Sequence, residues 1–224
     1  MKIKVEKYTG IDALHAANSY TTGHESKMSL RKAYSLMHSP IRTQRFYVYM
    51  EDIPLFCASQ FVRSTQGVQW YQRTRRTDRG GEDFAIECHD FGQRLDLVAE
   101  DIDEGLSGEK ADELTQTLDE MESEVKAWPK RFDRFALTSL MGDMNAEAII
   151  NMSKKRLCAK ASTETREIWE AVITELAKVD PDLARFCVKP CIFNGGICRE
   201  YKSCGFIKTS LFQHLLNQYK QLFL

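Results

Sequence analysis

Hydrophobic and polar residues alternate in two short stretches near the start of the chain, and a period of two predicts β-strands. The first stretch runs from Lys2 to Tyr8, and the second runs from Arg45 to Met50. In the second, Phe46 and Val48 fall on one face of the predicted strand. Residues 82–88 are a further candidate strand. We therefore expect a modest, mainly antiparallel sheet.

A period of 3.6 residues predicts several helices. They cover residues 11–20, 29–37, 55–63, 144–156 and 162–179. Residues 90–128 are acidic, and their apolar stripe also predicts a helix, through Leu114, Leu118, Met121 and Val125. Since no repeat or low-complexity linker interrupts the pattern, we expect one α/β domain of the α+β type over residues 1–224.

The composition is that of an ordinary globular protein, with 43% hydrophobic and 28% charged residues among 224. The net charge of −1 gives no overall attraction to nucleic acid or an anionic membrane, so an anion site must be local. No apolar run is long enough to span a membrane, and the N-terminus lacks the apolar core of a signal peptide. We expect a cytoplasmic protein.

The predicted helix over 144–156 carries polar side chains that suggest a binding site. Asn145, Asn151 and Arg156 interrupt its apolar positions, and both amides lower helix propensity. An amide can donate to and accept from the edge of a heterocycle, and a guanidinium suits phosphate or carbonyl oxygens. The alternative is that the two amides cap the helix or face solvent.

An arginine-rich segment over residues 60–81 is a second candidate site. Its five arginines stand beside Trp70 and Tyr71 and are Arg63, Arg73, Arg75, Arg76 and Arg79. Such a concentration of guanidinium groups suits phosphate. It could also be a solvated basic loop, an oligomer interface or a surface for single-stranded nucleic acid. We rank nucleic acid below a nucleotide, because no basic surface extends elsewhere.

Seven cysteines, an odd number with the first three scattered, favour mostly free thiols. The last four are Cys187, Cys191, Cys198 and Cys204. Four thiols could bind zinc tetrahedrally, but paired CxxC motifs are absent, and free thiols or a disulfide are the alternatives. No histidine lies nearby in sequence to activate a nucleophilic Cys191. We assign no metal ligand.

The ordered motifs resemble the flavin-dependent thymidylate synthase family over about residues 10–206. The C-terminal half carries Asn145-Ala146, Asn151, Arg156-Leu157-Cys158 and a helix containing Trp169. Upstream, the matching order continues through Ser39-Pro40, the strand from Arg45 and Gln60-Phe61-Val62-Arg63. The tail, with Pro190-Cys191, Gly196, Cys198, Glu200 and Cys204-Gly205, resembles one branch of the same family.

The resemblance implies a homotetramer with FAD at subunit interfaces. It implies methylation of dUMP, a deoxypyrimidine monophosphate, at C5, with methylenetetrahydrofolate as carbon donor and NADPH as reductant. Arg156 would be the catalytic residue, placed against the pyrimidine. By the same resemblance, FAD would contact Ser39, Arg63, Asn145 and Asn151, and the nucleotide would contact Gln60, Arg63, Arg75, Arg76 and Arg156.

The family signature R-H-R-x-x-S-x-N-E-x-S-x-R, read from Arg63, is altered in this chain. Ser64 and Thr65 replace its histidine and second arginine, and Arg73 stands where the last serine, which holds phosphate, is expected. A shift of one residue would make Arg76 rather than Arg75 the phosphate ligand. The changes leave two alternatives: action on another deoxypyrimidine monophosphate, such as dCMP or a hydroxymethylated product, or a catalytically silent protein that binds nucleotides or nucleic acid.

Overall fold

The computed structural model describes residues 1–73, 93, 116–121, 123 and 137–223. The chain divides into two compact units, residues 1–72 with 137–224 and residues 73–136. The predicted strand over 82–88 and most of 90–128 lie outside the described residues, whereas 116–121 and 123 are helical, as expected. No helix of the described ranges is long and apolar enough to cross a membrane. The extent of the predicted domain, residues 1–224, stays a prediction.

The first unit contains a four-stranded sheet in the order β1-β2-β4-β3, and every neighbouring pair is antiparallel. Its strands are β1 (Lys2–Lys7), β2 (Arg45–Pro54), β3 (Val68–Gln72) and β4 (Leu137–Asn145). This arrangement confirms the predicted fold class. Strand β2 runs past the predicted end at Met50, with a register shift before Ile53 and a positive φ of 55° at Asp52.

Two strands were not predicted. β3 lies within the segment interpreted as an arginine-rich loop, and β4 includes the first two residues of the helix predicted over 144–156. That boundary is therefore wrong: helix α6 spans Ala146–Arg156, and Asn145 is its N-cap. The Asn145 side chain accepts a hydrogen bond from the amide of Ala148, which stops the strand and starts the helix.

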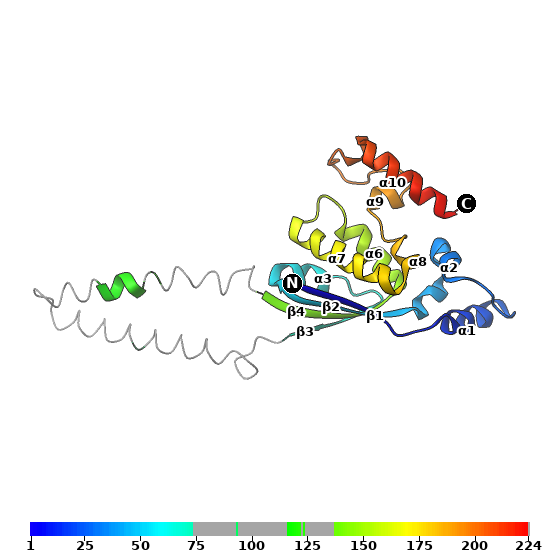
Figure 1. The fold of residues 1–224 in the computed structure, drawn as a ribbon, viewed down its shortest axis with the longest axis horizontal. Helices are drawn as coiled ribbons and strands as arrows, with labels where there is room; N and C mark the ends of the chain where they lie inside the picture. The colour runs from blue at the N-terminus through cyan, green and yellow to red at the C-terminus, as the bar shows by residue number, and fades with distance from the viewer. Residues whose placement is uncertain (74–92, 94–115, 122, 124–136, 224) are drawn as a thin grey trace, which may run out of the picture. The chain divides into compact units, whose positions relative to one another are not determined.

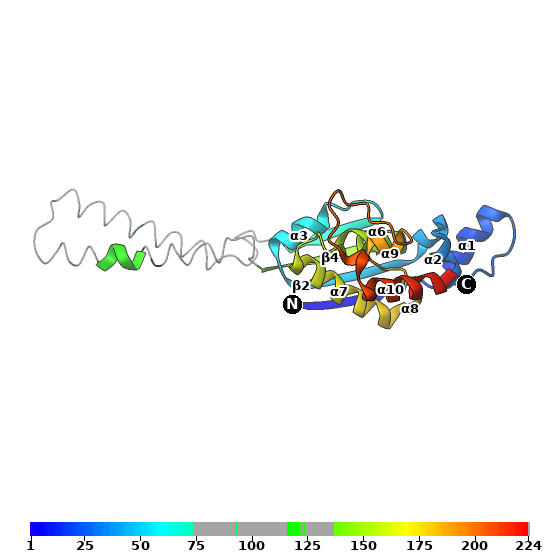
Figure 2. The ribbon, with the colours of Figure 1, turned by 90° about the horizontal axis from the view of Figure 1, so that it is seen from above.

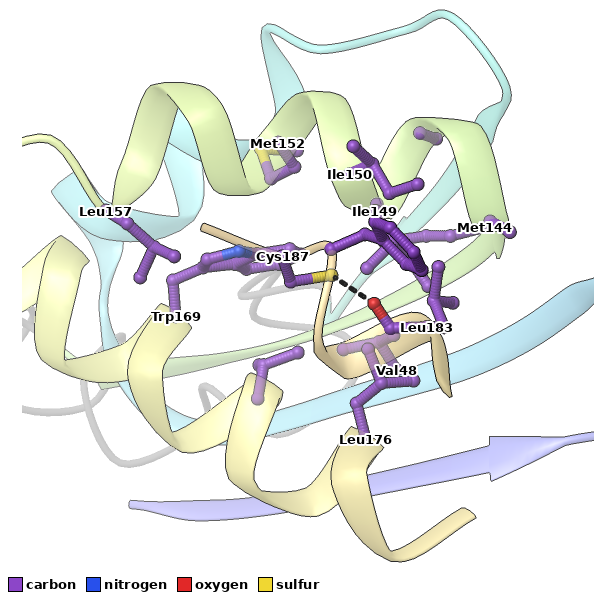
Figure 3. Packing of buried hydrophobic residues seen from close by; sticks show 14 of the residues in the cluster. Val48, Met144, Ile149, Ile150, Met152, Leu157, Trp169, Leu176, Leu183 and Cys187 are labelled. Atoms are coloured by element: carbon purple, nitrogen blue, oxygen red, sulfur yellow. Dashed lines mark hydrogen bonds between the residues drawn. The ribbon is translucent and has the colours of Figure 1, made fainter. Parts of the chain in front are cut away.

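Helices α3, α6 and α7 lie on one side of the sheet (Figures 1 and 2). Phe46 and Val48 of β2 are fully buried on this side, as predicted. Helix α7 spans Thr163–Val179 and buries a stripe of Ile168, Trp169, Val172 and Leu176. Figure 3 shows Trp169 and Leu176 of this stripe packed with Ile149 and Met152 of α6. The core therefore holds the face of α6 that lies toward the sheet, and the opposite face is left available for a binding site.

Shorter elements complete the unit. They are α1 (Ile11–Thr22), α2 (Leu30–Leu36), η1 (Ser39–Thr43), α3 (Leu55–Val62), α8 (Pro181–Ala184), α9 (Pro190–Phe193), η3 (Phe206–Lys208), α10 (Ser210–Lys220) and η4 (Gln221–Phe223). Buried Asp180 joins three of the elements, because its side chain accepts from Lys7 Nζ at 2.6 Å, Tyr34 OH at 2.8 Å and the Leu183 amide at 2.9 Å. With three donors the buried carboxylate is well satisfied.

Candidate active site

A cavity of about 280 Å³ opens between the end of α3 and the outer face of α6. Its lining residues are Arg63, Ser64, Thr65, Gln66, Val68, Met144, Ala148, Asn151, Met152 and Lys155. Two of them, Arg63 and Asn151, were predicted site residues. The fully buried Met144 and the nearly buried Met152 supply apolar surface, and the charged and amide groups stand around it. The combination suits a flat ring that carries polar edges and a negative charge.

Arg156, at the end of α6, is held against α3. Its Nη1 donates to Gln60 Oε1 at 3.3 Å, and its Nη2 donates to the Gln60 carbonyl oxygen. The guanidinium carbon also lies 5.8 Å from the centre of the Phe61 ring. Its Nε is buried and has no hydrogen-bond partner within the described ranges. A buried donor without a partner costs free energy, so an acceptor from a ligand would be favourable here.

Arg63 and Arg156 are close enough to influence one another. Burial lowers the pKa of Arg156, and the positive charge of Arg63 lowers it further. Neither arginine is paired with a carboxylate in the part of the chain that the structure describes. Two neighbouring guanidinium groups that lack an acidic partner favour an anion or a strongly polarised carbonyl group.

Lys155 is a lining residue that the sequence analysis missed. It follows Asn151 by four residues, so the two side chains lie on one face of α6. That spacing was a usable signal, but an exposed lysine at the end of a helix is common and attracts no attention by itself. Lys155 therefore adds a third positive charge to the region of Arg63 and Arg156.

Four of the predicted site residues that the structure describes lie outside the cavity lining: Ser39, Gln60, Asn145 and Arg156. Ser39 is exposed at the first position of η1. Asn145 is buried, and its backbone amide donates to the Gly67 carbonyl at 2.9 Å while its Oδ1 caps α6. The capping alternative for this side chain is therefore correct, and the cap uses its Oδ1 and not its Nδ2. Arg75 and Arg76 lie outside the described residues, so their roles stay predictions.

Of the four cysteines considered as a zinc site, Cys187 lies apart from the other three, which line a second, small cavity. Cys187 is buried in the core, where its thiol donates to the Leu183 carbonyl at 3.4 Å (Figure 3). Burial raises the pKa of Cys187 to about 12. Across the described ranges no group of three or more histidine, cysteine or acidic side chains could hold a metal ion. The burial of Cys187 disfavours a zinc site that includes it, and the other interpretations of the spacing stay predictions.

A family model described as thymidylate synthase complementing protein matches residues 7–182. The chain belongs to this family. The match includes Gln60, Arg63, Asn151 and Arg156, and it ends before the cysteine-rich tail. The resemblance found in the sequence is therefore confirmed, and the candidate cavity lies inside the family's common region.

Individual relatives are distant. A flavin-dependent thymidylate synthase of Clostridium tetani is 31% identical over 68 residues, which span 30% of this chain and 27% of that protein. ThyX from Helicobacter pylori, solved with FAD and dUMP, is 13% identical and covers 84% of this chain and 100% of its own, with a TM-score of 0.50. The UMP/dUMP methylase PolB from Streptomyces cacaoi, bound with 5-Br dUMP, is 15% identical over 83% and 94%, with a TM-score of 0.44. The ThyX structure confirms the family fold.

Proposed function

We propose that the protein methylates dUMP at C5 to give dTMP, with methylenetetrahydrofolate as carbon donor, NADPH as reductant and FAD as cofactor. Membership of the family supports this reaction class. The observation that carries the proposal is the buried Nε of Arg156, which has no partner among the described residues and stands beside the charge of Arg63. A pyrimidine that becomes anionic during reaction would supply the missing acceptor.

In this proposal Arg156 stabilises negative charge on the pyrimidine. The guanidinium stays protonated despite its lowered pKa, because an arginine pKa begins far above neutrality. Its half-buried position weakens screening by water, so a developing charge within hydrogen-bond reach is strongly favoured. Gln60 accepts hydrogen bonds from Nη1 and Nη2 of Arg156 and so fixes the orientation of the guanidinium group, which leaves Nε as the nitrogen available to a ligand. Arg63, Arg75 and Arg76 are proposed to bind the phosphate.

The residues present also fit a part of FAD. The cavity of about 280 Å³ is at the small end of ligand sites, so it has room for one ring system rather than a whole dinucleotide. Arg63 and Asn151, which line the cavity, would hold that part, and Asn145 and Ser39, which lie outside its lining, are proposed to contact other parts of FAD. FAD supplies hydride-transfer chemistry when bound. We propose that the remainder of its site comes from other copies of the chain in a homotetramer.

The first test is an absorbance spectrum of purified protein, with and without added FAD and dUMP. The proposal expects a bound flavin spectrum that shifts when dUMP is added, because both ligands would share one site. An Arg185→Ala variant is the control, since this exposed arginine pairs with Asp182 at 3.8 Å and lies outside the cavity. A protein that stays colourless in every condition would remove the flavin from the proposal.

A second candidate is action on another deoxypyrimidine monophosphate, such as dCMP, or formation of a hydroxymethylated product. The specific observation in its favour is that Ser64 and Thr65, the altered signature positions, line the cavity itself. Mass spectrometry of products from dUMP and dCMP in parallel separates the two. Clean dTMP from dUMP alone eliminates this candidate. Absence of turnover together with steeply salt-dependent binding of single strands would instead favour a silent binding protein.

A further inference from the structure

A second, smaller cavity of about 40 Å³ is lined by four cysteines, and none of them takes part in the site above. Cys158 comes from the loop after α6, whereas Cys191, Cys198 and Cys204 come from the tail. The family match ends at residue 182, so three of the four thiols that line this cavity lie beyond the common region. All four are free thiols. Their gathering in one cavity calls for a chemical explanation.

The backbone brings Cys191 and Cys198 toward one another. Cys191 is the second residue of the short helix α9, and the chain turns back after this helix through Gly195 and Gly196, both of positive φ. The Gly196 amide donates to the Cys191 carbonyl at 2.9 Å, which places the chain two residues before Cys198 directly beside Cys191. A reversal of this kind is what a disulfide between nearby cysteines requires.

The surroundings of the thiols single out this pair. Burial raises the pKa of Cys191, hydrogen bonds from the backbone amides of Ile192 and Cys191 lower it in part, and the nearby thiols of Cys198 and Cys158 raise it. Cys158 is directed elsewhere, because its Sγ lies 4.0 Å from Glu200 Oε1. Cys198 is only half-buried, so a reagent in solution can reach it. Cys198 is therefore the accessible thiol and Cys191 the buried one beside it.

We propose that Cys191 and Cys198 form a reversible disulfide in the presence of a small-molecule disulfide such as oxidised glutathione. The Cys198 thiolate attacks one sulfur of the reagent and forms a mixed disulfide, which releases one reduced thiol. The Cys191 sulfur then attacks Cys198, loses its proton and releases the second thiol. Two protein thiols are oxidised to one disulfide, and one reagent disulfide is reduced to two thiols.

The disulfide would act on the end of α6. Between the two cysteines stands Phe193, whose ring centre lies 4.0 Å from Lys154 Nζ. Just before them, Lys189 Nζ donates to the Leu157 carbonyl at 2.7 Å. The last turn of α6 carries Lys155 and Arg156, so closing the ring restrains the segment that supports the proposed site. This second part rests on the proposed function, whereas disulfide formation does not.

The test treats reduced full-length protein with oxidised glutathione, alkylates the remaining thiols after denaturation and digests with trypsin. Residues 186–199 form one tryptic peptide, because Lys189 precedes a proline, and this peptide contains Cys187, Cys191 and Cys198. We expect the peptide to lose two hydrogen masses and to carry one alkyl group, on Cys187. Dithiothreitol should restore three alkylated cysteines.

Two variants decide the pairing. Cys198→Ser should lose the intrapeptide disulfide, whereas Cys204→Ser, which changes an exposed thiol of the same cavity, should keep it. The proposal is overturned by a glutathione adduct that is never resolved, by a disulfide that includes Cys158 or Cys204, or by zinc bound to the purified protein. It is equally overturned if the thiols stay reduced.

A second measurement compares dUMP affinity of the reduced and oxidised protein, with Cys198→Ser treated in parallel. We expect oxidation to change the affinity of the wild type severalfold and to leave the variant unchanged. Equal affinity in the two wild-type forms would overturn the link to α6 alone. Absence of dUMP binding in both forms would count against the proposed function and leave the peptide result standing.

Discussion

The polar side chains at the two ends of α6 differ in whether their hydrogen bonds are satisfied. At the beginning of the helix, Asn145 caps the first turn, its amide donates to the Gly67 carbonyl, and Arg42 pairs with Glu147 of that turn. At the other end, Arg156 keeps a buried Nε with no partner in the described part of the chain, next to the charge of Arg63. One helix thus has a satisfied end and an end that lacks an acceptor.

This difference shows how to separate residues that build the fold from residues that bind. A buried polar group whose hydrogen bonds are all made contributes to stability, so its removal lowers the free energy of unfolding. A buried polar group without a partner reduces stability unless a ligand supplies that partner, so its removal mainly lowers ligand affinity or turnover. The four predictions that follow test this division at each end of α6, from the largest expected effect to the smallest.

Removing the guanidinium at the unsatisfied end should have the largest effect. Arg156→Ala should lower dTMP formation from dUMP by about 10²–10³-fold or more, as expected when a donor to developing charge is lost. The fold and any bound flavin spectrum should remain, because the side chain is not fully satisfied in the folded chain. Product analysis by mass spectrometry and urea denaturation measure the two effects. Turnover retained in this variant would contradict the role given to α6.

Gly67 tests the satisfied end, because a Cβ there would lie 2.5 Å from Asn145 Nδ2 and its φ is +73°. Gly67→Ala should lower the free energy of unfolding by about 2–3 kcal/mol, from backbone strain and the clash together. Gly23 has the same φ with no atom within 4 Å of such a Cβ, so Gly23→Ala should cost only about 1 kcal/mol. Equal costs in urea denaturation would show that the contact with Asn145 is unimportant.

Asn145 itself separates capping from cofactor binding. Asn145→Ala should lower the free energy of unfolding by about 1–2 kcal/mol, since the cap to the Ala148 amide is lost. Asn145→Asp keeps the capping oxygen and should stay close to the wild type in stability, while it removes the Nδ2 donor. Flavin titration of the stable Asp variant then tests the predicted contact with FAD. Unchanged flavin affinity would mean that Asn145 caps the helix and does not contact FAD.

The smallest effect is expected for Lys155, an exposed residue on the cavity rim. Lys155→Ala should weaken dUMP binding severalfold at low ionic strength, and the difference should fade as salt is added, because exposed charges are screened. Lys160→Ala removes an exposed lysine outside the cavity and should leave the affinity unchanged. The same loss in both variants would mean that overall charge, not the cavity, sets the affinity.

Much of the first unit could be predicted where burial follows a regular period. The shared face of Phe46 and Val48 in β2 and the helix predicted over 162–179 both agree with the structure. Strand β4 was missed because two of its inward positions are Thr138 and Gly142 rather than large apolar residues. A Cβ at Gly142 would lie 2.7 Å from the Trp70 ring, so a neighbouring strand fills the space that a side chain would occupy.

The candidate site was predictable only in part. The resemblance named Arg63, Asn151 and Arg156. Arg63 and Asn151 line the cavity, whereas Arg156 lies outside its lining, close enough to Arg63 for that charge to lower the Arg156 pKa. The contact between Gln60 and Arg156 joins residues 96 positions apart, which no local period can reveal. Cys158 was overlooked as a partner of the tail thiols for the same reason, since it comes from a different part of the chain.

The strand order has a consequence for how the chain reaches its folded state. Strands β2 and β4 pair along their length, yet the whole of residues 73–136 lies between β3 and β4 in sequence. Bringing β3 and β4 together across this stretch costs entropy that rises only with the logarithm of the number of residues between them. Changes in the length of the stretch should therefore alter the folding rate of the sheet only slightly. A change of length placed after Arg75 and Arg76 would leave both the strands and the proposed phosphate ligands in the chain.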